Sequence, residues 1–240
     1  MFKSIMENGV DRKSALNILE DFIDAKLHNY ESKRNYDYGP SAHENVSLLS
    51  PYIRHRIITE EEVIAKAINK FPLPKIEKYI QEVFWRTYWK GWLELRPKVW
   101  TDYQELVEKY DINQEYERII SLNTGIDCFD SWTQELLETN YLHNHARMWY
   151  ASIWIHTLKL PWSLGANLFL NNLLDGDPAS NTLSWRWVAG IQTKGKSYLA
   201  KDWNIQKFTK NRFEPKESDF SAIPAKVNYI DYKMNSIKFH

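Results

Sequence analysis

The feature that most constrains this chain is the spacing of its apolar residues, which recur three and four positions apart through most of the 240 residues. Alternation of apolar and polar residues, which is typical of half-buried strands, is nearly absent. This spacing predicts an all-α protein, and a chain of this length can bury a substantial core. We expect helices at about residues 13–26, 75–95, 100–110, 127–139, 144–158, 162–173 and 178–190.

Start and stop signals support this pattern. Thr59-Glu60-Glu61-Glu62 has the composition of a capping box, which predicts a further short helix before Pro72. Pro97 is expected to end the long helix at 75–95. Periodicity fades after residue 195, so we expect one helical domain at 1–216 and an irregular tail at 217–240.

Composition excludes several classes of protein. Cys128 is the single cysteine, so the chain has no internal disulfide and no four-cysteine iron–sulfur site. It has neither a signal-peptide core nor a run of about 18 apolar residues, so we expect a cytoplasmic monomer without membrane contact. Lys and Arg together number 31, as do Asp and Glu, which argues against a general binder of polyanions.

The charges are nevertheless unevenly distributed along the chain. Between residues 186 and 216, eight basic side chains are opposed only by Asp202 and Glu214. Such a cluster is either a solvated surface or a binding site for anions. We therefore expect one positive face on a molecule of zero net charge.

The stretch richest in polar and aromatic chemistry covers residues 175–187. Asp177 is a candidate N-cap and Pro178 fits the first helical position, so a helix is expected to begin at a corner rich in carboxylates. Asn181 and Trp185, four residues apart, then share one helix face. Two interpretations remain open, namely a site for a planar, charged ligand or a capped helix with packing tryptophans.

Four motifs in order along the chain narrow the choice. They are Val46-Ser47-Leu48-Leu49-Ser50-Pro51, Glu82-Val83-Phe84-Trp85-Arg86, Leu142-His143-Asn144-His145-Ala146-Arg147-Met148 and Asp175-Gly176-Asp177. Together they resemble the helical FAD-binding half of the photolyase/cryptochrome family, over residues 30–212. Members of that family normally begin with an α/β domain that often holds an antenna pigment, and this chain looks like a short form without it.

The resemblance implies that the first motif wraps the phosphates of FAD. Backbone N–H groups and hydroxyls that precede a helix suit a phosphate group. A valine stands where the family usually has Thr, which removes one hydroxyl contact. The cofactor ligands implied here are Tyr30, Ser47, Leu48, Leu49 and Ser50, and Arg34 is expected to face the substrate.

In the second motif, the resemblance implies contacts with a pyrimidine dimer flipped out of DNA. Glu82 and Trp85 are three residues apart and share a helix face, so a carboxylate can meet the edge of a base while the indole stacks on it. Arg86 is expected beside the FAD phosphates. Trp89 and Trp92, on the same helix, are expected in the hydrophobic core.

The third motif matches the form typical of enzymes that repair cyclobutane pyrimidine dimers. By resemblance, Asn144 touches flavin and substrate, Arg147 pairs with Asp175, and Met148 lies under the dimer. His145 stands where many members have Arg, which implies a weaker contact with DNA. The two histidines of this motif have no further Cys or His at suitable spacing, so no metal site is expected.

The Asp-Gly-Asp stretch gains roles from the same resemblance. Asp175 would lie with its arginine partner beside flavin N5, and Asp177 would hydrogen-bond the flavin or its ribose. Asn181 would face flavin N5 without supplying an acidic proton, as in members that work with fully reduced FAD.

Tryptophans further along the chain match two other family positions. Trp185 and Trp162 resemble the inner members of the tryptophan chain that photoreduces FAD, and Trp187 resembles a position that stacks on the substrate. No Trp falls where the outermost member of the chain is expected, and Tyr110 is the nearest alternative.

One position departs from the family pattern on the side that faces DNA. Ala200 stands where an Arg normally grips phosphate, two residues after Tyr198. Lys201 or Lys207 is expected to replace that Arg as a point charge.

The resemblance implies a light-driven repair enzyme that splits cyclobutane dimers in ultraviolet-damaged DNA, single- or double-stranded, with an electron from excited reduced FAD. One alternative is a cryptochrome-like blue-light sensor without repair activity, and another is a helical interaction module without cofactor. The dimer-pocket residues favour repair, because a sensor needs no dimer pocket; they are Glu82, Trp85, Asn144, Met148 and Trp187.

Overall fold

The computed structural model describes residues 9–40, 42–111, 124–193 and 196–220, and all the regular structure in these ranges is helical. The expected all-α class is therefore confirmed. The helices are α1 (Arg12–Ala25), α2 (Tyr30–Lys33), α3 (Ser50–Arg54), α4 (Glu60–Lys70), α5 (Leu73–Glu94), α6 (Pro97–Val107), α8 (Asp127–Thr139), α9 (Asn144–Ser152), α10 (Trp162–Asn172), α11 (Pro178–Val188) and α12 (Asp202–Phe208).

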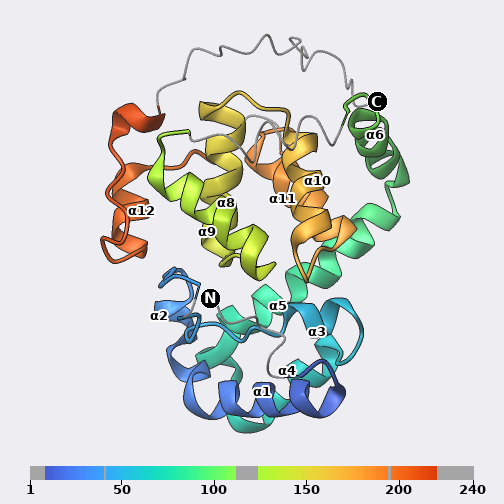
Figure 1. Ribbon diagram of the computed structural model, residues 1–240. Coiled ribbons are helices and arrows are strands. Elements are labelled where there is room, and N and C mark those ends of the chain that lie inside the picture. Colours follow the sequence, from blue (N-terminus) through green and yellow to red (C-terminus); the bar gives the residue numbers. More distant parts are fainter. Residues whose placement is uncertain (1–8, 41, 112–123, 194–195, 221–240) are drawn as a thin grey trace.

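Two groups of helices lie one above the other and are joined by α5 (Figure 1). The lower group buries one hydrophobic core, which includes Leu19, Tyr52 and Val63. The upper group, formed by α6 and the helices after it, buries a second core around Trp149 and Trp154. Among the described residues, no helix is long and apolar enough to cross a membrane.

Local capping chemistry explains where several helices begin. The Thr59 hydroxyl accepts from Glu62 N–H at 3.2 Å while the Glu62 carboxylate accepts from Thr59 N–H at 2.9 Å, so the predicted capping box is confirmed. Asp11 caps α1 in a similar way, through a 2.7 Å bond from Ser14 N–H. These ends were predictable because each cap is made by residues three positions apart.

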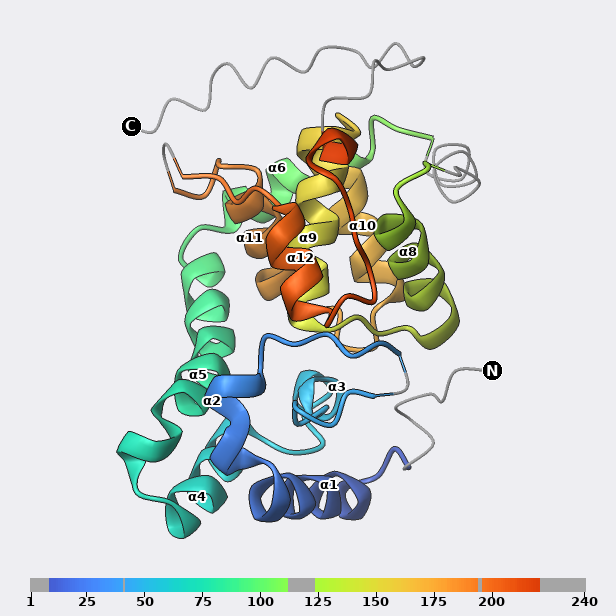
Figure 2. The same cartoon turned by 90° about the vertical axis from the view of Figure 1, so that its left-hand side faces the viewer.

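Pro97 and the segment after residue 195 differ from the sequence-based expectation. Pro97 does not simply end α5 but occupies the first position of α6, where a missing N–H costs nothing. Helix α12 was not predicted, because it is only seven residues long and Ile205 is its single buried residue. Figure 2 shows α12 against α9, where Trp149 Nε1 donates to Asn204 Oδ1 at 2.9 Å.

The tail predicted for residues 217–240 is described only over its first four residues. They form a short 3₁₀ turn, Glu217–Phe220. Residues 221–240 lie outside the described ranges, so the division at residue 216 stays a prediction.

Contacts between the two helix groups are largely polar. Arg54 Nε donates to Gly176 O at 2.7 Å, and His55 Nε2 lies 3.1 Å from Leu174 O. On the other side, the buried carboxylate of Asp37 accepts from Trp132 Nε1 at 3.1 Å. The two cores therefore do not merge, and the space between them is available for a ligand.

A glycine on α10 allows two indoles to pack beside this space. A methyl group at Gly165 would overlap the indole of Trp185 and would lie 2.9 Å from Trp154 Cε2. Gly91, on α5, has nothing within 4 Å of the same added atom. The two glycines are therefore a matched pair, one in a crowded environment and one in an open environment.

We expect Gly165→Ala to lower the free energy of unfolding by ~1–3 kcal/mol, because an overpacked core has to shift a tryptophan. Gly91→Ala should raise it by ~0.5–1 kcal/mol, since alanine is the better helix former. Urea denaturation of both variants checks this. Stabilisation of both variants would contradict the crowding at Gly165.

Candidate functional site

A cavity of about 740 Å³ lies between the two helix groups. Its walls come from α2, the loop before α3, α5, α9 and α11. This volume is in the range of sites for cofactors and other small molecules, which is about 300–1,000 Å³.

Most of the residues predicted from the motifs line this one cavity. They are Tyr30, Arg34, Ser47, Leu48, Leu49, Ser50, Glu82, Trp85, Arg86, Asn144, Arg147, Met148, Asp175, Asp177, Asn181, Trp185 and Trp187. Trp162, Lys201 and Lys207 are not among its lining residues. Segments more than 100 residues apart in the chain therefore converge, while the roles assigned to them stay predictions.

Asp175 and Arg147 form a buried ion pair in one wall. Arg147 Nη1 donates to Asp175 Oδ2 at 3.1 Å, and Nη2 lies 3.0 Å from Oδ1, so both terminal nitrogens of the guanidinium face the carboxylate. Burial by itself would raise the pKa of Asp175, but the charge of Arg147 and hydrogen bonds from Arg147 and Ser50 outweigh it and lower the pKa. The carboxylate is therefore ionised at neutral pH.

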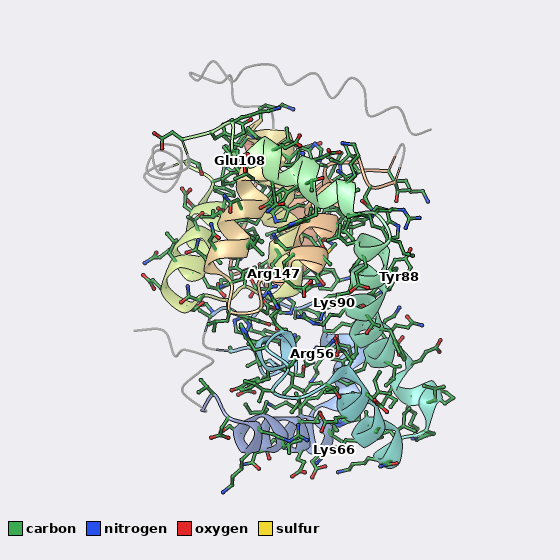
Figure 3. All side chains as sticks on the ribbon, turned by 90° about the vertical axis from the view of Figure 1, so that its right-hand side faces the viewer. Arg56, Lys66, Tyr88, Lys90, Glu108 and Arg147 are labelled. Atoms are coloured by element: carbon green, nitrogen blue, oxygen red, sulfur yellow. The ribbon has the colours of Figure 1, made fainter. Side chains whose placement is uncertain are left out.

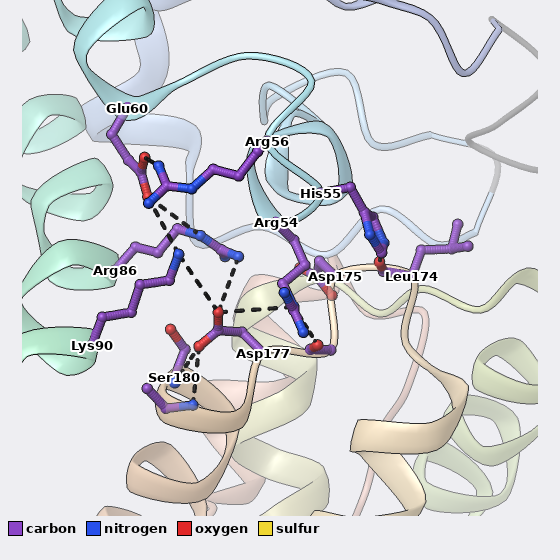
Figure 4. Close-up of polar contacts among 12 residues, drawn as sticks. Arg54, His55, Arg56, Glu60, Arg86, Lys90, Leu174, Asp175, Asp177 and Ser180 are labelled. Atoms are coloured by element: carbon purple, nitrogen blue, oxygen red, sulfur yellow. Dashed lines mark hydrogen bonds and ion pairs between the residues drawn. The ribbon is translucent and has the colours of Figure 1, made fainter. Parts of the chain in front are cut away.

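Asp177 caps α11 as predicted and also faces several cations (Figure 4). Its Oδ1 accepts from Ala179 N–H at 3.0 Å and from Ser180 N–H at 2.9 Å. Its Oδ2 lies 3.4 Å from Arg86 Nη2 and 3.9 Å from Lys90 Nζ. One carboxylate thus orients α11 and anchors two cations of α5.

A second carboxylate, Glu60, completes this cluster. Arg56 Nη1 donates to Glu60 Oε2 at 2.9 Å, and Arg86 Nε lies 3.6 Å from Oε1 (Figure 4). Arg54 Nε is 3.8 Å from Asp177 Oδ2, so four cations face two carboxylates. Burial lowers the pKa of Arg86, but arginine stays charged in proteins, so this corner keeps an excess of positive charge. Such a corner suits an anionic group.

Four buried polar atoms of the lining have no hydrogen-bond partner within the described part of the chain. They are Arg34 Nε, Arg86 Nε, Asp175 Oδ1 and Ser180 Oγ, although Arg86 Nε and Asp175 Oδ1 each lie near an opposite charge. Buried polar groups are nearly always paired, and an unpaired one costs about 1–3 kcal/mol. Their position in the lining indicates a ligand with several polar atoms.

Asn181 and Trp185 occupy the deepest part of the α11 wall, and both are buried. Asn181 Nδ2 donates to Ala166 O at 2.7 Å, which leaves the amide oxygen and the second N–H of Nδ2 for other partners. The Trp185 ring meets Trp154 edge to face at 6.1 Å and Phe169 at 5.1 Å between centroids. The predicted shared face of Asn181 and Trp185 therefore borders the cavity.

The cavity-lining residues expected to contact a substrate come from α5, α9, the end of α2 and α11. Arg34 Nη1 lies 3.1 Å from Glu82 Oε1 and holds that carboxylate at the cavity. Trp85 is 48% exposed and stacks on Trp89 with 5.4 Å between centroids. Trp187 stacks on Tyr198 at 5.5 Å.

The expectation that Trp89 and Trp92 belong to the core is wrong. Both are only partly buried, and Trp89 lines the cavity beside Trp85. The helical spacing placed them correctly on α5, but in this part of α5 no other helix covers that face closely enough to bury them.

His145 was expected to make a weaker contact with DNA than the Arg that is frequent at its position. It is buried, stacks on Trp149 at 4.0 Å and places Nδ1 2.9 Å from Asn35 O. Ala200 is buried too, and its N–H donates to Ser152 Oγ at 2.8 Å. Neither residue offers a side chain to a DNA phosphate.

An aromatic path that the motifs did not reveal leads from Trp162 across α6. Tyr103 lies 5.7 Å from Trp162 and 5.1 Å from Trp100 between ring centroids, and Trp100 is partly exposed. Trp100 is therefore a second candidate, beside Tyr110, for the outer position of the tryptophan chain, and this role stays a prediction. The available signal was the spacing of three residues between Trp100 and Tyr103, which puts them on one helix face.

The buried ring of His143 caps α9. Its Nδ1 accepts from His145 N–H at 3.2 Å, and the ring is fully buried near His43, Asp37 and Arg147. Burial is the main reason why the pKa of His143 falls from 6.5 to about 3. In the part of the chain that the structure describes, no group of three or more His, Cys, Asp or Glu side chains could hold a metal ion.

We expect the free energy of unfolding to fall as the pH is lowered from 6.5 towards 3, since in this window the unfolded chain protonates His143 and the folded chain does not. Protonation would also remove the ring nitrogen that caps α9. His143→Asn, which keeps a capping acceptor, should flatten this pH dependence. Denaturant unfolding across the pH series, with the exposed His28→Asn as control, measures it; an unchanged slope in His143→Asn would refute the assignment.

Comparison with known proteins gives a consistent result. The family described as the FAD binding domain of DNA photolyase matches residues 79–218. A deoxyribodipyrimidine photo-lyase of Agrobacterium fabrum is 32% identical over 183 residues, which are 73% of this chain and 37% of that protein. One from Vibrio cholerae is 24% identical, over 75% of this chain and 40% of that protein. The chain thus spans about two fifths of the length of such curated relatives.

Solved structures agree with the fold. A bacterial class III photolyase from Agrobacterium tumefaciens superposes with a TM-score of 0.69 and 26% identity, covering 88% of this chain and 44% of that one. A cryptochrome from Synechocystis gives a TM-score of 0.70 with 20% identity, over 82% of this chain and 43% of that one, which shows the shared fold alone.

Proposed function

The chain belongs to the FAD-binding domain family of DNA photolyase, with FAD as its cofactor, and we propose that it repairs cyclobutane pyrimidine dimers in DNA under light. The observation that carries this proposal is that a charged, polar wall and an aromatic wall with Glu82 face the same cavity. A cofactor and a flipped dimer can therefore be held next to each other.

The residues of the polar wall fit FAD. The cation excess around Arg86 and Lys90 suits the diphosphate, and the unpaired Arg86 Nε and Ser180 Oγ need acceptors or donors of the kind that FAD offers. When bound, FAD supplies the light absorption and the electron that dimer cleavage requires. Asn181 would contribute an amide that can hydrogen-bond the flavin without supplying an acidic proton, and the Arg147–Asp175 pair would hold a fixed pair of charges beside it.

The aromatic wall fits a flipped dimer. Trp85 and Trp187 supply faces on which bases stack, and Glu82, held by Arg34, accepts hydrogen bonds from a base edge. Flipping costs a few kcal/mol and least for damaged bases, because their stacking and pairing are already weakened. The wall therefore selects the lesion before any chemistry occurs.

A blue-light sensor of the cryptochrome type is the second candidate. Zero net charge and the buried Ala200 favour the sensor function, because both weaken binding to the phosphates of DNA. Glu82, Trp85 and Met148 support repair, because a sensor has no use for them. A helical module without cofactor is disfavoured by the family match.

Trp185→Phe is expected to reduce the light-driven reduction of oxidised FAD to near zero, because Trp185 is a buried tryptophan of the cavity wall that shares a helix face with Asn181. Trp100→Phe should slow the same process by removing the exposed end of the aromatic path. The measurement is the loss of oxidised-flavin absorbance under illumination with a thiol reductant. Trp132→Phe, deep in the upper core, is the control, and a wild-type rate in Trp185→Phe would point to Trp154 instead.

DNA binding tests the proposal itself. Each phosphate contact contributes a slope of about −0.9 in log K against log salt on duplex DNA, and we expect roughly three to five contacts. Lys201→Ala and Lys207→Ala should weaken the binding of damaged and of intact DNA equally. Trp187→Ala should instead reduce the binding preference for the dimer by ~1–3 kcal/mol. Matched oligonucleotides with and without one dimer, titrated over a salt series, give both quantities. If the wild-type protein binds damaged and intact DNA equally at every salt concentration, the repair function is refuted and the light-sensor function replaces it.

A further inference from the structure

Helix α5 exposes an aromatic face to solvent. Lys78, Gln81, Trp85, Tyr88 and Trp92 follow one another at intervals of three and four residues, so they share this face. Trp85 is 48% exposed and Tyr88 is 54% exposed. Large aromatic side chains are usually buried in a soluble domain, and a contiguous exposed group of them indicates a binding surface.

The rings of this face are in contact with one another. Tyr88 meets Trp85 edge to face at 5.4 Å and Trp89 at 5.1 Å, and these three residues also line the cavity. Trp92 lies one turn further along and outside the cavity, with Arg96 over its ring at 4.4 Å. Figure 3 shows Tyr88 on the outer side of α5 and Lys90 on the side towards the rest of the molecule. The aromatic surface therefore continues from the cavity mouth onto the outside of α5.

We propose that Tyr88 and Trp92 stack the unpaired bases next to the lesion, so that the protein prefers a dimer in single-stranded DNA over the same dimer in a duplex. This inference rests on the proposed repair function. Seven residues separate Trp85 from Trp92, about 10 Å along a helix. Stacked bases are about 3.4 Å apart along a strand, so the surface is long enough for two of them.

Charge and geometry favour a nucleic acid strand over a protein helix on this face. Lys78 lies at one end and Arg96, which covers one face of the Trp92 ring, lies at the other, so a strand that crosses the free ring faces meets a cation at each end. Stacking on aromatic rings accepts any base, because every base has a flat face. In a duplex both faces of a base are covered by its neighbours, so only an unpaired strand can use Tyr88 and Trp92 fully.

Two substitutions at Tyr88 and one at Leu95 separate stacking from simple hydrophobic contact. Tyr88→Ala removes the ring and Tyr88→Phe keeps it. Leu95→Ala removes an apolar side chain that is 80% exposed at the end of α5, which a protein partner would use and a base would not need. FAD content and helical circular dichroism of each variant establish that the fold and the cofactor are retained.

The experiment is titration of four oligonucleotides, single-stranded and duplex, each with and without one dimer. We expect Tyr88→Ala to weaken the binding of the single-stranded dimer by about 5-fold or more, which is equivalent to the loss of at least ~1 kcal/mol of stacking. The same substitution should weaken the binding of the duplex dimer by less than about 2-fold. Tyr88→Phe and Leu95→Ala should bind both like the wild type.

Equal losses on single strands and duplex, or no loss on either, would overturn the inference while leaving repair intact. A loss of binding in Leu95→Ala, together with self-association of the wild type in sedimentation, would make this face an interface between copies and also overturn it. A failure of the repair function would give a different result, because the wild-type protein would then bind damaged and intact DNA equally, both as single strands and as duplex.

Discussion

The ion pairs of two buried carboxylates at the start of α11 are the constraint on which the rest of the structure depends. Asp177 meets cations from α3 and α5, and Asp175 meets Arg147 of α9. Removing one partner of a buried pair typically costs about 3–5 kcal/mol, because the remaining charge stays away from water. The contacts of Asp177 with Arg54 and Arg86 therefore tie the upper group to α3 and α5 beside the cavity, while the Arg147–Asp175 pair fixes α9 to the loop before α11.

The cavity has one wall of charged and hydrogen-bonding groups and one wall of aromatic rings. The α11 side is ionised and hydrogen-bonding, which suits a phosphate-bearing, polar cofactor. The α5 side is aromatic, with Glu82 as its charged group, which suits flat bases. Because α5 crosses both helix groups, Arg86 and Lys90 face the carboxylates, Trp85 lines the cavity, and Tyr88 lies on the outer side of the helix. The position of a bound base is thus tied to that of the cofactor through one rigid helix.

Much of the fold could be predicted because its signals are local. Helix α8 has the expected bounds, and the caps at Thr59 and Asp177 each depend on residues two or three positions apart. Most of the site residues named from the motifs line the cavity, but about half of its lining residues, such as Ile53, Tyr79 and Tyr141, were not identified from the sequence. Helix α12 and the turn at Ile153–Thr157, which is a π-helix and not a continuation of α9, lacked such signals because distant packing stabilises them.

The amino-acid sequence by itself determined the helical class, the helix starts and the chemical types gathered in the site. Only the tertiary structure decided which face of each helix is covered. Trp89 and Trp92 have the spacing of core residues but border solvent and the cavity, while His145 turns inwards onto Trp149. Trp100, Tyr103 and Trp162 become a continuous path only when α6 and α10 meet. Helical spacing specifies which residues share a face, whereas the burial of that face depends on segments far away in the chain.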